Sequence, residues 1–199
     1  LESEAIPNEI GRDGHKVEIF DSTYYAIDYG IDSDGSQVDK LSVVPFDMGE
    51  RGIRLKTTVW EDDLKEQVNR FKPDLLAMST TEDMWELGLK ILDVIKDYKI
   101  KNKIPTIAGG VFPTFAPEIA IKQELVDIVC VGEGENALVD LCKRIEKKED
   151  YTNLTNCWVK TIGPEYLKNR NVIRKNPIAK PVDMNENPTI DLSLFEENR

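Results

Sequence analysis

Glycines gather at two places in the middle of the sequence, each directly after a short apolar run. Thr106-Ile107-Ala108 is followed by Gly109-Gly110, and Asp127–Val131 is followed by Gly132 and Gly134. Two such units predict parallel strands whose carboxyl ends meet at one edge of an open sheet, where ligands bind in this class of fold. Because glycine has no Cβ, it permits a positive φ and lets a flat ligand approach the backbone. The pattern therefore indicates a binding edge for a broad, flat ligand.

Three hydroxyl side chains follow an earlier apolar run. Leu75–Met78 is typical of a parallel strand covered on both faces, and it ends in Ser79, Thr80 and Thr81. These hydroxyls could donate or accept hydrogen bonds to a ligand that enters beside the strand. We expect no catalytic residue in this chain.

Helices and strands alternate around these positions. Helices are predicted over Glu61–Phe71, Glu82–Tyr98 and Glu135–Lys147, each with an apolar stripe at helical spacing. Pro117 is suited to the first turn of a further helix. The alternation predicts an α/β fold: a doubly wound, flavodoxin-like (Rossmann-like) parallel sheet with helices on both faces.

The character of the sequence changes after residue 150. We expect residues 1–150 to form the α/β domain and residues 151–199 to form a β-hairpin and a proline-rich linker. The hairpin is indicated by β-like runs at Asn156–Thr161 and Val172–Lys175. Prolines recur after it with few apolar residues, which is typical of a linker.

The first third of the chain is less regular. Val17–Asp21 alternates like a strand, and Leu41–Phe46 could form another. Since doubly wound domains normally open with a strand, we expect an opening strand before Leu1, although a helix-first domain over residues 1–14 is an alternative. The Asp-Ser-Asp-Gly-Ser run at 32–36 predicts a turn rather than a calcium loop, because the later ligand positions are missing.

The composition excludes some classes of partner. The 199 residues include 26 basic and 37 acidic ones, a formal net charge of −11. An acidic chain is poorly suited to nucleic acid or to anionic lipid. No apolar run approaches the roughly 18 residues of a membrane span, and no signal-peptide pattern opens the sequence. We therefore expect a cytoplasmic protein with neither a nucleic-acid nor a membrane partner.

The three cysteines, Cys130, Cys142 and Cys157, are odd in number and widely spaced. This spacing favours neither a disulfide framework nor a metal site. We expect reduced thiols, with Cys130 and Cys142 packed in the core.

The glycine-rich edge resembles a known family. Ser79-Thr80-Thr81 and Gly109-Gly110 resemble two elements of the cobalamin-binding motif. The segments Gly109–Thr114 and Asp127–Glu135 are similar to the cobalamin-binding domain that precedes the barrel in cobalamin-dependent radical S-adenosylmethionine enzymes. Asp183–Asp191 resembles the segment just before that barrel. The resemblance covers about residues 11–21 and 60–199.

The resemblance implies a site in which cobalamin lies across the glycine-rich edge, with apolar contact from Val111 and Phe112. The implied cofactor-binding residues are Ser79, Thr80, Thr81, Gly109, Gly110, Val111, Phe112, Pro113, Thr114, Gly132, Glu133, Gly134 and Glu135. It also implies methyl transfer, or oxidative cyclisation of the kind assigned to anaerobic magnesium-protoporphyrin IX monomethyl ester cyclases.

Two features depart from related families. The Cys-x-x-x-Cys-x-x-Cys triad of radical enzymes does not occur, so a 4Fe-4S cluster and S-adenosylmethionine are expected only on a radical S-adenosylmethionine domain beyond Arg199, which would be the partner of this one. His15 partly fits the Asp-x-His-x-x-Gly cobalt-ligand motif, but Glu18 replaces the glycine. We interpret His15 as a turn residue and expect no metal ligand here.

Two alternatives stay open. The chain could keep the fold without the cofactor and serve as a binding or interaction module, since fold alone does not give function. Gly109-Gly110 would then be an ordinary tight turn between a strand and a helix. A flavodoxin or response-regulator domain is a weaker alternative, because neither an acidic cluster nor Gly-x-Gly-x-x-Gly follows a first strand.

Overall fold

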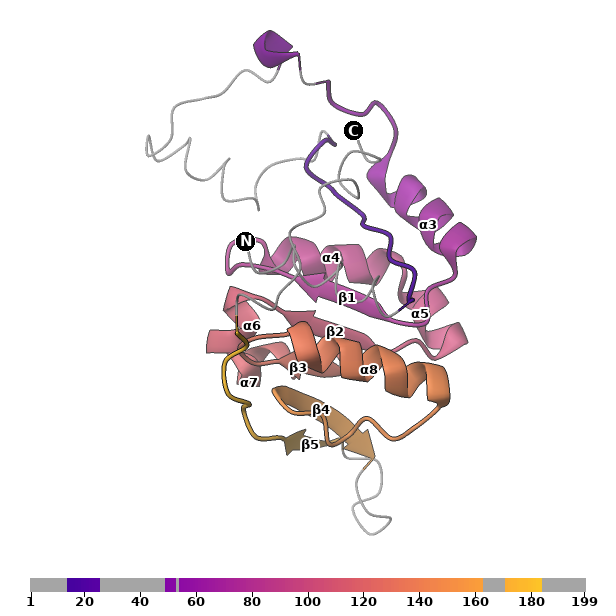
Figure 1. Ribbon diagram of the computed structural model, residues 1–199. Helices are drawn as coiled ribbons and strands as arrows, with labels where there is room; N and C mark the ends of the chain where they lie inside the picture. Colours follow the sequence, from indigo (N-terminus) through magenta and orange to yellow (C-terminus); the bar gives the residue numbers. More distant parts are fainter. Residues whose placement is uncertain (1–13, 26–48, 53, 163–170, 184–199) are drawn as a thin grey trace.

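The computed structural model describes residues 14–25, 49–52, 54–162 and 171–183 (Figure 1). The expectations for residues 1–13, 32–36, 41–46 and 184–199 lie outside the described residues. They stay predictions.

In the part of the chain that the structure describes, five strands form one sheet in chain order, β1-β2-β3-β4-β5. They are β1 Leu76–Ser79, β2 Thr106–Gly109, β3 Ile128–Cys130, β4 Cys157–Ile162 and β5 Asn171–Lys175. β1, β2 and β3 pair in parallel, which confirms the predicted parallel sheet. The predicted hairpin is present as β4 and β5, and β4 pairs antiparallel with β3, so the whole sheet is mixed. The expected boundary at residue 150 therefore falls between two neighbouring strands of one sheet.

The helices follow the predicted apolar stripes. They are α3 Trp60–Phe71, α4 Trp85–Val94, α5 Lys96–Asn102, α6 Val111–Phe115, α7 Pro117–Ala120 and α8 Glu135–Lys147, with a short 3-10 helix η1 at Gly49–Arg51. Pro117 opens α7 as expected, because its fixed φ suits a first turn. The predicted helix Glu82–Tyr98 is divided at Ile95, whose φ of −108° and ψ of 12° leave the helical region.

Helices cover both faces of the sheet, as predicted, with α8 in front of it in Figure 1 and α4, α6 and α7 behind. The α8 face buries a cluster formed by Ile107, Ile128, Cys130, Ala137, Leu138, Leu141, Leu154, Cys157 and Val159. The other face buries Trp85, Leu92, Ala108, Ala120, Ile121, Leu125, Val126 and Val129. Because β2 and β3 are covered on both sides, their sequences are nearly continuous in apolar residues.

The predicted strand Val17–Asp21 is wrong. This segment is extended but forms no ladder with another strand among the described residues. It lies instead along α3, where Gln67 donates a hydrogen bond from Nε2 to the carbonyl of Ile19 (3.2 Å). Arg70 forms an ion pair with Glu18 at 2.8 Å. Apolar and polar residues alternate in this segment because one side of it packs against a helix, and not because it belongs to a sheet.

Candidate functional site

The carboxyl ends of β1, β2 and β3 meet at one edge of the sheet, on the left in Figure 1. Ser79 at the end of β1 is in register with Gly109 at the end of β2. The loops that follow lead into α4, α6 and α8. The structure thus brings together the three sequence segments that carried the predicted site, and we call this region the carboxyl edge.

The three hydroxyl residues after β1 play different parts. Ser79 and Thr81 are exposed. Thr80 is buried, and its Oγ1 donates to the carbonyl of Thr81 (2.9 Å). Its backbone also holds the next loop, since Thr80 N donates to Gly109 O (3.1 Å) and Phe112 N donates to Thr80 O (3.3 Å). Ser79 and Thr81 can therefore reach a ligand, whereas Thr80 serves the loop.

Gly110 is a glycine because the loop packs closely against β1. Its φ is 94°, and a Cβ built on it would lie 2.8 Å from both the N and the O of Thr80. A Cβ on the neighbouring Gly109 would make only ordinary contact with Cys130 (3.6 Å). The turn alone thus accounts for Gly110, and its part in a ligand shelf stays a prediction.

Gly132 is different, because it faces open space. Its φ is 85°, it is exposed, and a Cβ built on it would meet no atom within 4 Å. Its N–H donates to Oγ1 of Thr114 (3.1 Å), which links the loop after β3 to α6. The backbone here is bare on its outer side.

The two glutamates of this loop point to different partners. Glu133 Oε2 accepts the backbone N–H of Val182 (2.6 Å), and its carbonyl accepts Nδ2 of Asn156 (2.7 Å). Glu135 lies at the start of α8, after Gly134, and is only 5% exposed. Its Oε2 is buried and has no hydrogen-bond partner among the described residues. Glu133 therefore anchors a later segment of the chain, while Glu135 keeps a buried acceptor that no described residue satisfies.

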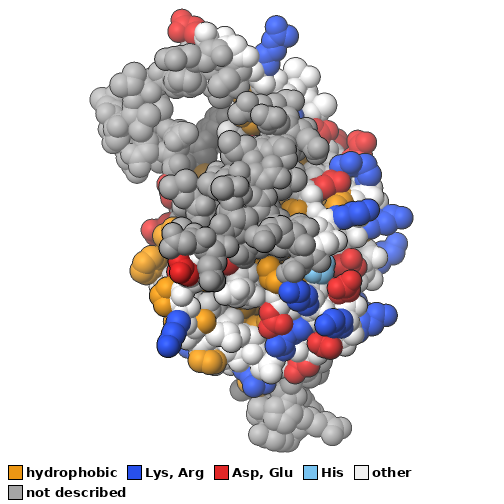
Figure 2. All heavy atoms as spheres, viewed as in Figure 1, with side chains coloured by type: hydrophobic (Ala, Val, Ile, Leu, Met, Phe, Trp, Pro, Cys, Tyr) orange, Lys and Arg blue, Asp and Glu red, His pale blue; other side chains and the backbone are white. Residues whose placement is uncertain are grey.

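The predicted apolar contacts on α6 divide in two. Phe112 packs on Trp85, with ring centroids 4.7 Å apart, and Pro113 is buried, so both belong to the core. Val111 is exposed and Phe115 is 84% exposed. Figure 2 shows hydrophobic side chains gathered on the left side of the molecule, where Figure 1 places α6 and α7.

Sequence reasoning missed the segment 176–183, which returns to the carboxyl edge after β5. Asn156 holds it: its N donates to Pro177 O (2.9 Å) and its Oδ1 accepts Ala179 N (2.6 Å). Asn156 has a φ of 64°, a conformation that asparagine tolerates better than most residues. The available signal was the asparagine that opens the predicted strand at 156 and lies just before β4 in the structure. We call residues 176–183 the strap.

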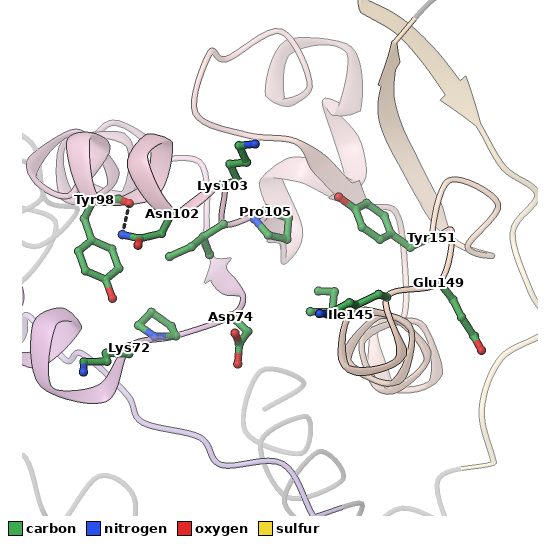
Figure 3. A pocket seen from close by; sticks show the side chains of 12 residues that line it. Lys72, Asp74, Tyr98, Asn102, Lys103, Pro105, Ile145, Glu149 and Tyr151 are labelled. Atoms are coloured by element: carbon green, nitrogen blue, oxygen red, sulfur yellow. Dashed lines mark hydrogen bonds between the residues drawn. The ribbon is translucent and has the colours of Figure 1, made fainter.

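A cavity of about 590 Å³ lies at the opposite edge of the sheet (Figure 3). It is formed near the amino ends of β1 and β2 and the last residues of α5 and α8, with Asp74, Tyr98, Pro105 and Tyr151 among its lining. Burial raises the pKa of Tyr151, with a smaller effect from Asp127. This cavity does not include any predicted site residue.

Within the described ranges, no group of three or more His, Cys, Asp or Glu side chains lies close enough to hold a metal ion. His15 follows the turn at Gly14 and leads into the extended segment beside α3. No helix in the described part of the chain is both long and apolar enough to cross a membrane.

Comparison with known proteins supports the resemblance seen in the sequence. Residues 47–142 match the family model of the B12 binding domain. A segment of 131 residues, 63% of this chain, is 28% identical to 4'-phospho-dehydrooxetanocin synthase of Priestia megaterium and covers 16% of that protein.

Solved structures share the fold. The radical S-adenosylmethionine methyltransferase TsrM from Kitasatospora setae, with tryptophan and a SAM analogue bound, matches 90% of this chain with a TM-score of 0.58 and 15% identity. The cobalamin-dependent S-adenosylmethionine radical enzyme OxsB, with aqua-cobalamin and S-adenosylmethionine bound, matches 75% with a TM-score of 0.56 and 22% identity. The chain spans only 27% and 21% of these two chains. The predicted resemblance and the predicted fold class are thus confirmed.

Proposed function

We propose that this chain, which carries a domain of the B12-binding family over residues 47–142, binds cobalamin at the carboxyl edge of β1, β2 and β3. The observation that carries the proposal is the open backbone at Gly132, on an edge where three parallel strand ends meet. A corrin is wide and flat, so it needs such a surface without side chains.

The residues at this edge fit the chemistry of the cofactor. Glu135, whose Oε2 is buried without a hydrogen-bond partner among the described residues, would support the edge from within rather than touch the corrin. Exposed hydroxyls at Ser79 and Thr81 could bind the nucleotide tail, and exposed Val111 and Phe115 offer apolar contact. The remaining predicted residues, Thr80, Gly109, Gly110, Phe112, Pro113, Thr114, Glu133 and Gly134, would shape the edge rather than all touch the ligand.

We further infer that the chain is the cobalamin-binding part of a longer radical S-adenosylmethionine enzyme, since the proteins it resembles are several times longer. The 4Fe-4S cluster and S-adenosylmethionine would belong to that partner domain, and the reaction would be methyl transfer or oxidative cyclisation. Bound cobalamin would supply a carrier for a methyl group or electrons, and this chain would hold and orient it. A cytoplasmic location stays a prediction.

A second candidate is a domain of the same fold that binds no cofactor and serves as an interaction module. Two contacts favour it. Gly110 is explained by close packing on Thr80, and the carboxylate of Glu133 is engaged by the strap. Both use predicted ligand residues for the structure of the chain itself.

One experiment distinguishes the two candidate functions. The purified protein is mixed with hydroxocobalamin and desalted, and its visible spectrum is recorded. Cobalamin binding predicts a corrin band retained near one equivalent. A protein that emerges without the band supports the interaction module.

A pair of alanine variants tests where cobalamin binds. In Gly132→Ala a Cβ would occupy the open side of the edge, and we expect about tenfold weaker retention, the size of a close steric conflict. Gly14→Ala is the matched control, because Gly14 has a similar φ of 89° and open surroundings but lies away from the edge. If both variants and the parent retained equal amounts of cobalamin, Gly132 would not be part of the binding site.

A further inference from the structure

Two buried cysteines face each other across the junction of β3 and β4. Cys130 and Cys157 are directly paired in the antiparallel ladder. The next pair along is joined by a hydrogen bond from Val131 N to Asn156 O (2.7 Å). Because hydrogen-bonded and non-hydrogen-bonded pairs alternate in such a ladder, the cysteines form a non-hydrogen-bonded pair, in which the Cα atoms lie about 4.5 Å apart. This separation is within the range that a disulfide spans.

The two thiols already interact. They are 4% and 0% exposed and belong to one core cluster. A hydrogen bond with Cys157 lowers the pKa of Cys130, and the same bond together with burial raises the pKa of Cys157. The Cys130 thiol in turn lies 3.7 Å from the carbonyl of Glu133, to which it can donate. Cys130 is thus the more acidic thiol and connects β4 to the loop of the carboxyl edge.

We propose that Cys130 and Cys157 are a modification site, and that a low-molecular-weight disulfide such as glutathione disulfide converts them reversibly into a cross-strand disulfide. When a local opening of β3 and β4 exposes Cys130, its thiolate attacks the reagent, forms a mixed disulfide and releases one reduced thiol. The Cys157 thiolate then attacks the Cys130 sulfur and releases the second. The protein loses two electrons and two protons, and the reagent gains them as two thiols.

The disulfide has a consequence at the carboxyl edge. Without its hydrogen, Cys130 no longer donates to Glu133 O, which leaves Asn156 Nδ2 as the donor to that carbonyl. The loop that carries Gly132 loses one of its supports. This step rests on the proposed cobalamin function: we expect the oxidised protein to bind a corrinoid about two- to fivefold more weakly, the effect of one weak S–H···O contact.

The test begins with the intact chain equilibrated in glutathione buffers of graded oxidation, quenched with acid, unfolded and alkylated. The reduced protein has three free cysteines to alkylate. After oxidation we expect only Cys142 to react, and an unreduced digest to contain the peptide that joins Cys130 to Cys157. Three alkylated cysteines in the most oxidising buffer, or a lasting glutathione adduct on Cys130, would overturn the proposal.

Cysteine variants identify which two thiols form the disulfide. Cys142→Ala is the matched control: burial raises the pKa of Cys142 to about 11, and it lies on α8 outside the pair. It should still lose two reactive thiols on oxidation, whereas Cys157→Ala should lose the cross-link. If Cys157→Ala does not fold, the peptide map of the parent and of Cys142→Ala decides alone.

Hydroxocobalamin titration of the reduced and oxidised forms tests the second step. Equal affinity of the two forms would contradict the coupling to the edge. If neither form binds hydroxocobalamin, the proposed function fails. The alkylation result then still tests whether the disulfide forms.

Discussion

At the scale of residues, Gly110 and Gly132 are the same residue type for different physical reasons. Both have a positive φ. Gly110 has no room for a side chain, because the backbone of Thr80 occupies the place of its Cβ, whereas Gly132 borders open space. The sequence shows both as strand-end glycines. Only the contacts separate the one that shapes the loop from the one that can face a ligand.

Gly110→Ala should destabilise the fold. The added Cβ would lie 2.8 Å from Thr80 N and O at a φ of 94°, so the loop or β1 must shift. We expect the free energy of unfolding to fall by about 2–4 kcal/mol, from strain and overpacking together. Urea unfolding measures this. Gly109→Ala, whose Cβ makes an ordinary contact at 3.6 Å, should cost less than about 1 kcal/mol. A similar loss in both variants would contradict this account of Gly110.

The raised pKa of Tyr25 predicts how the free energy of unfolding changes at high pH. Its hydroxyl donates to Oδ2 of Asp63 (2.8 Å), and burial, with that hydrogen bond, raises its pKa to about 12 from 10.0. The protonated form is therefore favoured in the folded state. The stabilisation is complete below pH 10, the pKa of the unfolded chain, and is lost as the pH rises towards about 12. Urea unfolding of the parent and of Tyr25→Phe at several pH values should show a steeper loss of unfolding free energy with rising pH in the parent than in the variant.

At the scale of elements, three helices end in the same way. α3, α5 and α8 are each followed by a lysine in the left-handed conformation, Lys72, Lys103 and Lys148. Glycine is the residue usually found at this position, because a Cβ there is strained. The lysines keep a positive charge near the negative end of each helix dipole.

Lys148→Gly should stabilise the protein slightly. Relief of strain at a φ of 56° exceeds the loss of one exposed charge, so we expect a gain of about 0.5–1 kcal/mol in the free energy of unfolding. Lys147→Gly is the control one residue earlier, inside the last turn of α8, and should cost about 1 kcal/mol. Thermal unfolding of the two variants tests the prediction. Destabilisation by Lys148→Gly would contradict it.

Elements with a strong apolar period could be predicted from the sequence, and irregular ones could not. The bounds of α8 agree with the prediction, because its apolar stripe and basic end are both local signals. The division between α4 and α5 at Ile95 has no glycine or proline to announce it. Val17–Asp21 alternates as a strand does, yet it packs against α3, and a pattern in one segment does not show which partner lies beside it.

At the scale of the whole molecule, the strap joins the end of the described chain to the carboxyl edge. Glu133 binds Val182 across 49 residues, and Asn156 binds Ala179 across 23. Such pairs depend on how β4 and β5 return beside β3, so the sequence predicts the segments of the site but not their mutual contacts. The same limit explains why the hydrogen bond between Glu133 and the strap was not predicted, while the expected role of Glu133 at the ligand stays a prediction.

Asn156→Gly should loosen the strap without straining the backbone. Glycine tolerates the φ of 64°, but the two side-chain hydrogen bonds to Ala179 and Glu133 are lost. We expect limited proteolysis to cleave within residues 176–183 about tenfold faster, since each bond contributes about 1 kcal/mol. The exposed neighbour Thr155, changed to Gly, serves as the control. An unchanged cleavage rate in Asn156→Gly would show that other contacts hold the strap.

The central claim is that cobalamin lies on the carboxyl edge, and hydrogen exchange of the chain with and without hydroxocobalamin tests it most directly. We predict slower exchange in the loops at 79–81, 110–114 and 131–135. Exchange should be unchanged around the cavity at the opposite edge, which is lined by residues 72–74, 102–105, 148, 149 and 151 among others. Protection confined to that cavity, or no protection at all at saturating cobalamin, would contradict the account.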